Sequence, residues 1–581
     1  MPAADETQIP LSLYLWRRIR QLGTQSIMGV PGDMNLELLD YLYDVDGLFW
    51  VGNANELNAA YAADGYARVK GSPGVVVTTM GVGELSALNG VAGAYTEVKL
   101  IHIVGTTATH VQAKRLMIHH NLGPNPDHKV FEKISSHVRC AHAWLDDPAT
   151  AAAEIDRVIM KCLVDSLPVY IFVPMDFVHV PVDAEPLLTP IKADFPVDKH
   201  QETRAVSKVV EAIQNARRPV LLVDCLTDRH QGLEEARELA DLLQFPIFST
   251  SMGKTIISED HPYYFGIYNG SVSYPGVKSA VEESDCILNL GPLLADSNTG
   301  GLTRNIDDSR VILIEPKSCT VELQLTKVVL RRLLTSLGSL ERRAVPLPSL
   351  PDQPAEVESE SETITQSWIW KRLGAFTKKG DVLIAESGTA QFGFPDAKFP
   401  TGAKYVTQVY YGSIGYSVGA CLGVALAQRE RKTESGCPGR TILVVGDGSL
   451  QLTVQEIGTM IRLGLNPLII VINNRGYTIE RAIHGPNAGY NDISTWKYQL
   501  LLNFFGAEYP EQSSREVRTK EEMEAVLSLD DYLSATSIQL LEVHMSALDI
   551  PWRLKNQIAI INARGKAKAT GIQTIHSINP L

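Results

Sequence analysis

A strand–helix–strand unit near the end of the chain constrains its fold more than any other feature of the sequence. Residues 441–445 read TILVV, a β-branched run that predicts a buried parallel strand and leads into a Gly-Asp-Gly turn. Apolar residues then recur at helical spacing over 452–463, and PLIIVI at 467–472 predicts a second buried strand. Such a crossover places the carboxyl ends of both strands at one edge of a parallel sheet, where open α/β sheets bind ligands. We therefore expect Asp447 and Asn474 to lie side by side although they are 27 residues apart in the sequence.

The polar groups at this edge predict a site for a divalent cation and a diphosphate. Asp447 offers a carboxylate, Asn474 an amide oxygen and Gly476 a free carbonyl. Such hard oxygen ligands suit Mg²⁺, which fills its remaining positions with phosphate and water. Gly448 allows close backbone approach, and the helix expected to begin near Ser449 offers free N–H groups to a diphosphate. A Gly-Asp-Gly turn alone is more often a plain strand-to-helix turn, so the prediction depends on its combination with the paired asparagines.

These strings resemble the signature of a known enzyme superfamily. GDGSLQLTVQE at 446–456, NNRGYTIE at 473–480 and IHG at 483–485 resemble the thiamine diphosphate enzymes, and within them the fungal pyruvate decarboxylase group. The resemblance covers nearly the whole chain in the same order. It implies thiamine diphosphate and Mg²⁺ as cofactors. One departure lies in the metal loop, where Arg475 stands in place of the family's acidic residue.

Composition excludes several other classes of protein. The 581 residues carry a formal net charge of −13 that is spread along the chain, with no basic cluster to bind nucleic acid or anionic lipid. The first residues lack the apolar core of a signal peptide, and no apolar run approaches membrane-spanning length. The seven scattered cysteines form no metal-binding or disulfide pattern, and fit a reducing compartment. We expect a cytoplasmic protein with no nucleic-acid or membrane partner.

Short β-rich runs alternate with amphipathic helical windows throughout, which predicts an α/β fold with three doubly wound parallel sheets. Proline-rich stretches at 178–198 and 343–363 divide the chain into three blocks. The resemblance assigns these blocks to a pyrimidine-binding domain at 1–182, a central non-catalytic domain at 199–342, a linker at 343–364 and a diphosphate- and Mg²⁺-binding domain with a C-terminal tail at 365–581.

A helix is expected to open within GNANELNAAYAADGYAR at 52–68, directly after a strand at 48–51. Read without context, Asn53 and Glu56 form a capping box at the start of this helix. The resemblance supports a different role for Glu56. In the family this glutamate hydrogen-bonds the aminopyrimidine ring of the cofactor and promotes the tautomer that removes the thiazolium proton.

Four further residues resemble the family's acid–base groups. Asp33 lies in VPGDMNL, which alone predicts a turn, and His119 and His120 lie in HHNLG, which alone predicts a polar loop. Glu480 directly follows Tyr-Thr-Ile and would otherwise be read as a surface residue at a helix start. Because imidazole titrates near neutral pH, the histidines suit proton transfer. The resemblance implies a proton relay of these four residues, in which Asp33, His119 and His120 serve the enamine and release steps, while the charge of Glu480 next to the departing carboxylate promotes decarboxylation.

The resemblance also places a set of residues around the cofactor. Those not yet named are Ser387, Thr389, Gly412, Ser413, Ile414, Gly446, Tyr477, Thr478 and Ile479, which join Glu56, Asp447, Gly448, Ser449, Asn474 and Gly476. In the family the carbonyl at Gly412 accepts the 4′-amino group, and the side chain at Ile414 wedges the two cofactor rings into a bent conformer.

The predicted reaction is the non-oxidative decarboxylation of a 2-oxo acid, with pyruvate as leading substrate, through a ylide and an enamine. Aromatic or branched 2-oxo acids remain an alternative, because Gln391, Ser297 and Leu302 stand where pyruvate-preferring relatives carry other residues, including a Phe at the last. A carboligase and a non-catalytic, filament-forming relative are weaker alternatives. The family binds its cofactor between two chains, which implies a homodimer as the active minimum and a homotetramer as the complete assembly.

Overall fold

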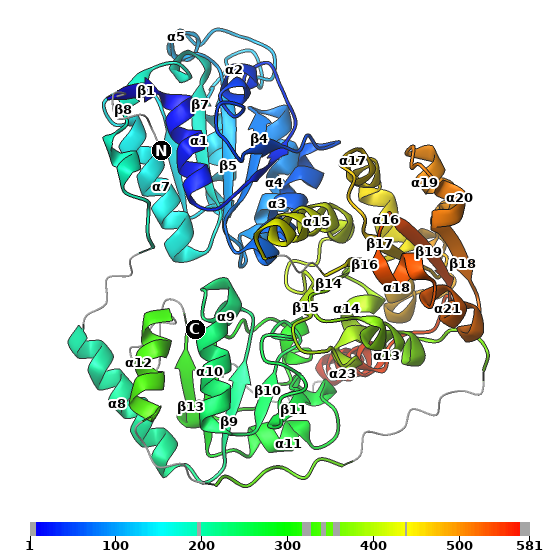
Figure 1. The fold of residues 1–581 in the computed structure, drawn as a ribbon. Coiled ribbons are helices and arrows are strands. Elements are labelled where there is room, and N and C mark those ends of the chain that lie inside the picture. Colours follow the sequence, from blue (N-terminus) through cyan, green and yellow to red (C-terminus); the bar gives the residue numbers. More distant parts are fainter. Residues whose placement is uncertain are drawn as a thin grey trace.

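Three parallel β-sheets, each covered by helices, form the bulk of the molecule in this computed structural model (Figure 1). The structure describes residues 7–193, 199–315, 327–338, 344–351, 361–435 and 439–569. The remaining parts of the two proline-rich stretches and the end of the C-terminal tail lie outside these ranges. Within them, no helix combines the length and the apolar composition needed to cross a lipid bilayer.

The N-terminal sheet has six strands in the order β3-β2-β4-β5-β7-β6, and all of its pairings are parallel. Its strands are β2 (Ser26–Gly29), β3 (Phe49–Trp50), β4 (Gly74–Thr79), β5 (Leu100–Thr106), β6 (Ala141–Trp144) and β7 (Val169–Pro174). Its helices are α1 (Leu11–Gln21), α2 (Leu36–Asp40), α3 (Glu56–Lys70), α4 (Val82–Ala94), α5 (Thr109–Ala113), α6 (Val130–Ile134) and α7 (Ala151–Asp165). Val75 and Val77 of β4 join one hydrophobic core and Val76 joins the other, so both faces of the sheet are buried. A short antiparallel pair, β1 (Gln8–Pro10) with β8 (Pro181–Asp183), closes this unit.

The C-terminal sheet repeats this winding. Its order is β15-β14-β16-β17-β19-β18, so that in both sheets the strands, counted along the chain, lie in the order 2-1-3-4-6-5. Its strands are β14 (Val382–Ala385), β15 (Lys404–Val406), β16 (Thr441–Gly446), β17 (Leu468–Asn473), β18 (Ser514–Val517) and β19 (Gln539–His544). Its helices are α13 (Gln366–Phe376), α14 (Thr389–Gly393), α15 (Tyr416–Ser435), α16 (Asp447–Thr453), α17 (Glu456–Arg462), α18 (Thr478–Ile483), α19 (Leu501–Phe504), α20 (Pro510–Ser513), α21 (Lys520–Leu527), α22 (Asp530–Ser534) and α23 (Trp552–Ala569).

The central sheet is wound differently, with five parallel strands in the order β11-β10-β9-β12-β13. These are β9 (Pro219–Val223), β10 (Ile247–Ser249), β11 (Tyr264–Ile267), β12 (Cys286–Leu290) and β13 (Val311–Ile314). The helices around them are α8 (Lys199–Asn215), α9 (Leu226–Arg229), α10 (Leu233–Leu243), α11 (Val277–Glu282) and α12 (Lys327–Gly338). The predicted fold class, three doubly wound parallel sheets, is confirmed.

The prediction of one helix that begins near Ser449 and continues through the window 452–463 is wrong in detail. Helix α16 begins earlier, at Asp447, because Gly446 takes an extended N-cap conformation with φ −72° and ψ 151°. It ends at Thr453, whose side-chain hydroxyl donates to the carbonyl of Gly415 at 2.6 Å, and α17 begins three residues later. The segment after β16 is therefore two short helices, and the N-terminus of the first lies directly at the end of the strand.

Helices α3 and α15 cross at close range and join the N-terminal unit to the C-terminal unit (Figure 1). Small residues allow this approach. A Cβ atom added to Gly423 would lie 1.8 Å from the carbonyl oxygen of Ala62, and one added to Gly65 would lie 2.4 Å from that of Ala420. The two backbones are thus in contact, with no room for a side chain.

We predict that Gly423→Ala destabilises the protein by roughly 1–3 kcal/mol, because the added methyl must push the two helices apart. Thermal unfolding would show this as a lower Tm. Gly338→Ala is the matched control: this glycine is also helical, but nothing lies within 4 Å of the added Cβ. The control variant should be neutral or stabilised by up to about 1 kcal/mol, because alanine favours the helix. Equal Tm values for the two variants would contradict the close packing of α3 on α15.

Candidate active site

The C-terminal sheet has a topological switch point between β14 and β16, whose connections leave toward opposite sides of the sheet. Ligands bind in α/β sheets at such points, in the crevice beyond the carboxyl ends of the strands. Asp447 lies at the end of β16, and Asn474 and Gly476 follow the neighbouring strand β17. Ser387 and Thr389 follow β14, on the other side of the same crevice.

Asp447 bridges the ends of β16 and β17. Its Oδ1 accepts a hydrogen bond from the N–H of Gly448 at 2.8 Å, and its Oδ2 accepts one from the N–H of Gly476 at 3.1 Å. Only 2% of its surface is exposed, and this burial raises the pKa of Asp447 to about 6 although the backbone N–H groups act in the opposite direction. A cation bound at this carboxylate would compensate it for the water contacts that it loses on folding.

The amide of Asn474 tests whether Mg²⁺ fits here. Its oxygen lies 3.2 Å from Oδ1 of Asp447 and 2.8 Å from the carbonyl oxygen of Gly476, so three acceptors meet without a proton between them. If the oxygen and nitrogen of the amide are exchanged, the nitrogen donates to both of these oxygens and the oxygen accepts from the hydroxyl of Thr478 at 3.0 Å. The first orientation suits a site that holds a cation, and the second suits an empty one. The predicted ligands therefore fit Mg²⁺.

Two glycines give the metal loop its shape. Gly476 has φ +125°, and a Cβ there would lie 2.4 Å from the carbonyl oxygen of Asn491. A Cβ on Gly448 would lie 2.8 Å from the ring of Tyr477, which packs over it. Arg475, the departure from the family pattern, is exposed and takes a left-handed backbone conformation with φ +61°.

A residue that sequence reasoning missed, Arg481, holds this loop from behind. Its buried guanidinium donates to the carbonyl of Arg475 at 2.8 Å and to Oδ1 of Asp492 at 2.8 Å. These partners lie six and eleven residues away along the chain, but no sequence pattern distinguishes Arg481 from an ordinary surface arginine on a short helix.

Glu386 forms hydrogen bonds to two loops that flank the other side of the crevice. Its carboxylate accepts from the N–H of Ser387 at 2.8 Å, the N–H of Gly415 at 3.2 Å and the hydroxyl of Ser417 at 2.6 Å. Burial raises the pKa of Glu386 to about 7 against these hydrogen bonds. The loop at 411–415, which contains Gly412, Ser413 and Ile414, is thereby fixed next to Ser387.

The remaining predicted contacts lie around the same crevice. Ser449 is on the first turn of α16, Thr478 begins α18 and donates from its hydroxyl to the carbonyl of Ala547 at 3.0 Å, and Ile479 is half-buried. Glu480, the third residue of α18, is exposed.

Glu56 lies at the start of α3, in the N-terminal unit. The capping-box interpretation is wrong: the N-cap is Asn55, whose side chain accepts from the N–H of Asn58 at 2.9 Å. The side-chain oxygen of Asn53 instead accepts a hydrogen bond from the N–H of Gly29 at 3.0 Å. Nothing in the described ranges hydrogen-bonds the carboxylate of Glu56, so it remains available to a ligand.

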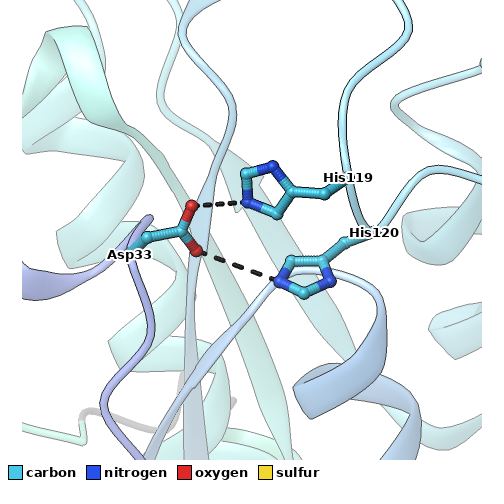
Figure 2. Close-up of side chains that lie close together, drawn as sticks. All are labelled: Asp33, His119 and His120. Carbon is cyan, nitrogen blue, oxygen red and sulfur yellow. Dashed lines mark hydrogen bonds and ion pairs between the residues drawn. The ribbon is translucent and has the colours of Figure 1, made fainter.

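Asp33, His119 and His120 form a cluster, drawn in Figure 2. Nε2 of His119 lies 2.5 Å from Oδ2 of Asp33, and Nε2 of His120 lies 3.9 Å from Oδ1. The two imidazole rings meet edge to face at 4.6 Å between centroids. Asp33 follows β2, at the switch point of the N-terminal sheet, and the histidines come from the loop after α5. Residues 86 positions apart thus form a connected acid–base group.

The site is divided into two half-sites within one chain. We call Asp33, Glu56, His119 and His120 the acid–base half-site, and the crevice from Ser387 to Glu480 the diphosphate half-site. Among the described residues, no hydrogen bond or ion pair joins an acid–base residue to Asp447, Asn474, Gly476 or Glu480. In Figure 1, α2 and α5, the helices next in the chain to Asp33 and the histidines, lie at one end of the N-terminal unit, whereas α16 and α18 lie in the C-terminal unit.

Comparison with known families explains this division. A model described as the N-terminal TPP binding domain of thiamine pyrophosphate enzymes matches residues 11–131, which contain the whole acid–base half-site. Models for the central domain and for the C-terminal TPP binding domain match residues 206–328 and 387–528, and the latter contains the diphosphate half-site. A pyruvate decarboxylase of Kluyveromyces lactis is 44% identical over 96% of this chain and 99% of its own length. This chain belongs to the pyruvate decarboxylase family of thiamine pyrophosphate enzymes.

Other members of this family match as completely. Pyruvate decarboxylase isozyme 2 of Saccharomyces cerevisiae is 44% identical over 96% of the chain and 99% of its own length. A pyruvate decarboxylase of Aspergillus fumigatus is 43% identical over 97% of the chain and 99% of its own length. Two separate family models describe TPP binding, and each of them contains one of the two half-sites.

We predict that Asp447→Asn lowers the affinity for Mg²⁺ by about 100-fold or more, since even the loss of an outer-shell partner typically costs 10–100-fold. Titration of the apoprotein with Mn²⁺, followed by electron paramagnetic resonance, measures this without catalysis. Asp492→Asn is the control, because Asp492 binds Arg481, which holds the metal loop, and contributes none of the three converging oxygen atoms. Equal losses in both variants would mean that the three converging oxygens do not hold the cation.

Proposed function

We propose that this chain catalyses the non-oxidative decarboxylation of pyruvate to acetaldehyde and CO₂ with thiamine diphosphate and Mg²⁺. The observation that carries the proposal is the presence, in one chain, of an intact acid–base half-site and an intact diphosphate half-site. Relatives named pyruvate decarboxylase match nearly its full length. A carboligase would have less use for the acid–base group of Asp33, His119 and His120.

Bound thiamine diphosphate supplies the nucleophilic carbon and the electron sink for the loss of CO₂. The protein holds it. Asp447, Asn474 and Gly476 would ligate Mg²⁺, and Ser387, Thr389 and the free N–H groups at the start of α16 would bind the diphosphate. The carboxylate of Glu56, which has no partner within the described residues, would hold a proton at a ring nitrogen of the pyrimidine.

Proton transfer to the substrate falls to the cluster of Asp33, His119 and His120. The 2.5 Å contact between His119 and Asp33 lets a proton pass between carboxylate and imidazole, and His120 lies next to both. Glu480 would add negative charge next to the departing carboxylate and so favour its release as neutral CO₂.

A homodimer is part of the proposal, because the two half-sites of one chain do not meet. Exposed apolar side chains surround each half-site, as expected of surfaces that a partner covers. Around the acid–base half-site these are Val82, Leu85, Leu116, Met117 and Leu122, and around the diphosphate half-site they are Tyr410, Tyr411, Ile414, Leu452, Ile483 and Tyr490. A twofold axis would pair each half-site with the complementary half-site of a second copy. We further propose that two dimers form a tetramer.

The cytoplasm is the proposed location. No disulfide bond joins any two of the five cysteines in the described ranges, which is typical of proteins in a reducing compartment.

We predict a higher kcat/KM for pyruvate than for phenylpyruvate, and a loss of activity of about 10²–10⁴-fold in Glu56→Gln, because the variant cannot exchange a proton at the pyrimidine. Aldehyde formation with saturating thiamine diphosphate and Mg²⁺ measures both. Glu37→Gln serves as control, because Glu37 is an exposed glutamate of the same unit that pairs with His179. A preference for phenylpyruvate would favour the aromatic alternative and point to Gln391 and Leu302.

We predict that two inactive variants restore activity when their chains are mixed. In a heterodimer of Glu56→Gln with Asp447→Asn, one site receives both substitutions and the other receives neither. Random exchange of subunits should then restore about a quarter of the wild-type activity. If mixing after reversible dissociation gives no recovery, although wild-type chains recover under the same treatment, each active site lies within one chain.

A further inference from the structure

We propose that Tyr61 and Asn89 of the N-terminal unit position the cofactor-binding loop at 411–415 of the same chain. The proposal rests on the proposed function, in which Gly412 and Ile414 of this loop contact thiamine diphosphate. Tyr61 and Asn89 would not touch the cofactor. They would act through Ser413, the residue between the two contacts.

A polar network joins the loop to helices α3 and α4. The hydroxyl of Tyr61 lies 2.5 Å from that of Ser413. Nδ2 of Asn89 donates to the hydroxyl of Tyr61 at 3.1 Å and lies 3.4 Å from that of Ser413. On the other side of the amide, Tyr411 donates its hydroxyl hydrogen to Oδ1 of Asn89 at 2.9 Å. The first residue of the loop, Tyr411, and its middle residue, Ser413, are thus held by two side chains of the other unit.

Within the loop, Ser413 differs from its neighbours. Gly412 is exposed, and Ile414 is 39% exposed, whereas Ser413 is half-buried and turned toward Tyr61. The N–H of Ser413 also donates to Oε1 of Gln408 at 3.0 Å. Gly412 has φ +64°, a conformation that glycine adopts without strain. The loop is therefore fixed at its middle residue while the groups on either side remain open to a ligand.

Tyr61 itself is closely packed. Tyr61 is 1% exposed, its ring packs edge to face on Tyr416 at 5.5 Å, and it lies on α3 where that helix crosses α15. Burial raises the pKa of Tyr61 to about 12, so the hydroxyl keeps its proton at any working pH. Ile414 can hold a ligand in one conformer only if its backbone does not move, and this network supplies that restraint.

Tyr61→Phe tests the proposal, because it removes one hydroxyl and leaves the packing intact. Tyr66→Phe is the matched control. Tyr66 lies on the same helix, is fully buried, and donates across the same interface to Glu430 at 2.6 Å, far from the loop. Three quantities are measured on each full-length protein with Mg²⁺: the Kd of thiamine diphosphate by titration of the apoprotein, the rate at which the C2 proton of the bound cofactor exchanges for deuterium, and Tm.

We expect Tyr61→Phe to weaken thiamine diphosphate binding by about fivefold, as the loss of one net hydrogen bond predicts. At saturating cofactor its C2 exchange should also be slower than wild type, because the two rings are held less firmly. Tyr66→Phe should lower Tm while the Kd and the exchange rate stay at wild-type values. Ser413→Ala removes the same hydrogen bond from the loop side, and combining it with Tyr61→Phe should add little to either single effect.

The proposal is overturned if exchange in Tyr61→Phe matches that in Tyr66→Phe at saturating cofactor, or if the effects of Tyr61→Phe and Ser413→Ala simply add. Should Tyr61→Phe fail to fold, Ser413→Ala alone decides, since this serine is only half-buried. A wild-type protein that binds no thiamine diphosphate would instead refute the proposed function, so the two failures are distinguishable.

Discussion

The backbone contact between α3 and α15 is the constraint on which the rest of the site depends. Helix α3 begins with Glu56, and α15 begins directly after the loop that contains Ser413. Because Gly65 and Gly423 leave no space between the helices, the position of one helix fixes that of the other. A buried tyrosine at each end of the crossing, Tyr61 and Tyr66, adds a hydrogen bond to the opposite unit.

The two outer units are counterparts in topology. In each sheet the second strand along the chain leads into one of these two crossing helices, and the switch point lies between the first strand and the third. The N-terminal switch point carries Asp33, and the C-terminal one carries Asp447. An old duplication of one unit would account for this, with acid–base groups retained at one switch point and a diphosphate crevice at the other. The central sheet has a different strand order and contributes no predicted site residue.

Buried carboxylates do different work on the two sides of the diphosphate crevice. Asp447 has backbone N–H partners on both oxygens, and its Oδ1 also lies 3.2 Å from the side-chain oxygen of Asn474, an arrangement that a bound cation would stabilise. Glu386 is satisfied within the protein by four donors, including two from the start of α15, and so serves to hold the loops together. Two carboxylates that are buried to the same extent thus have different roles: Asp447 is a proposed metal ligand, and Glu386 holds two loops together.

Local sequence determined much of this. The β-branched runs predicted the buried strands, because a strand covered on both faces must be apolar throughout. The Gly-Asp-Gly and paired-Asn strings predicted the position of the crevice, because a parallel crossover places both strand ends at one edge of the sheet. Tertiary structure decided the rest. Asn55 rather than Asn53 caps α3 and so frees Glu56, Arg481 braces the metal loop, and Tyr61 reaches Ser413. The partner of each of these polar side chains depends on contacts between residues that are distant in sequence, and so does the separation of the two half-sites within one chain. No local pattern encodes such contacts.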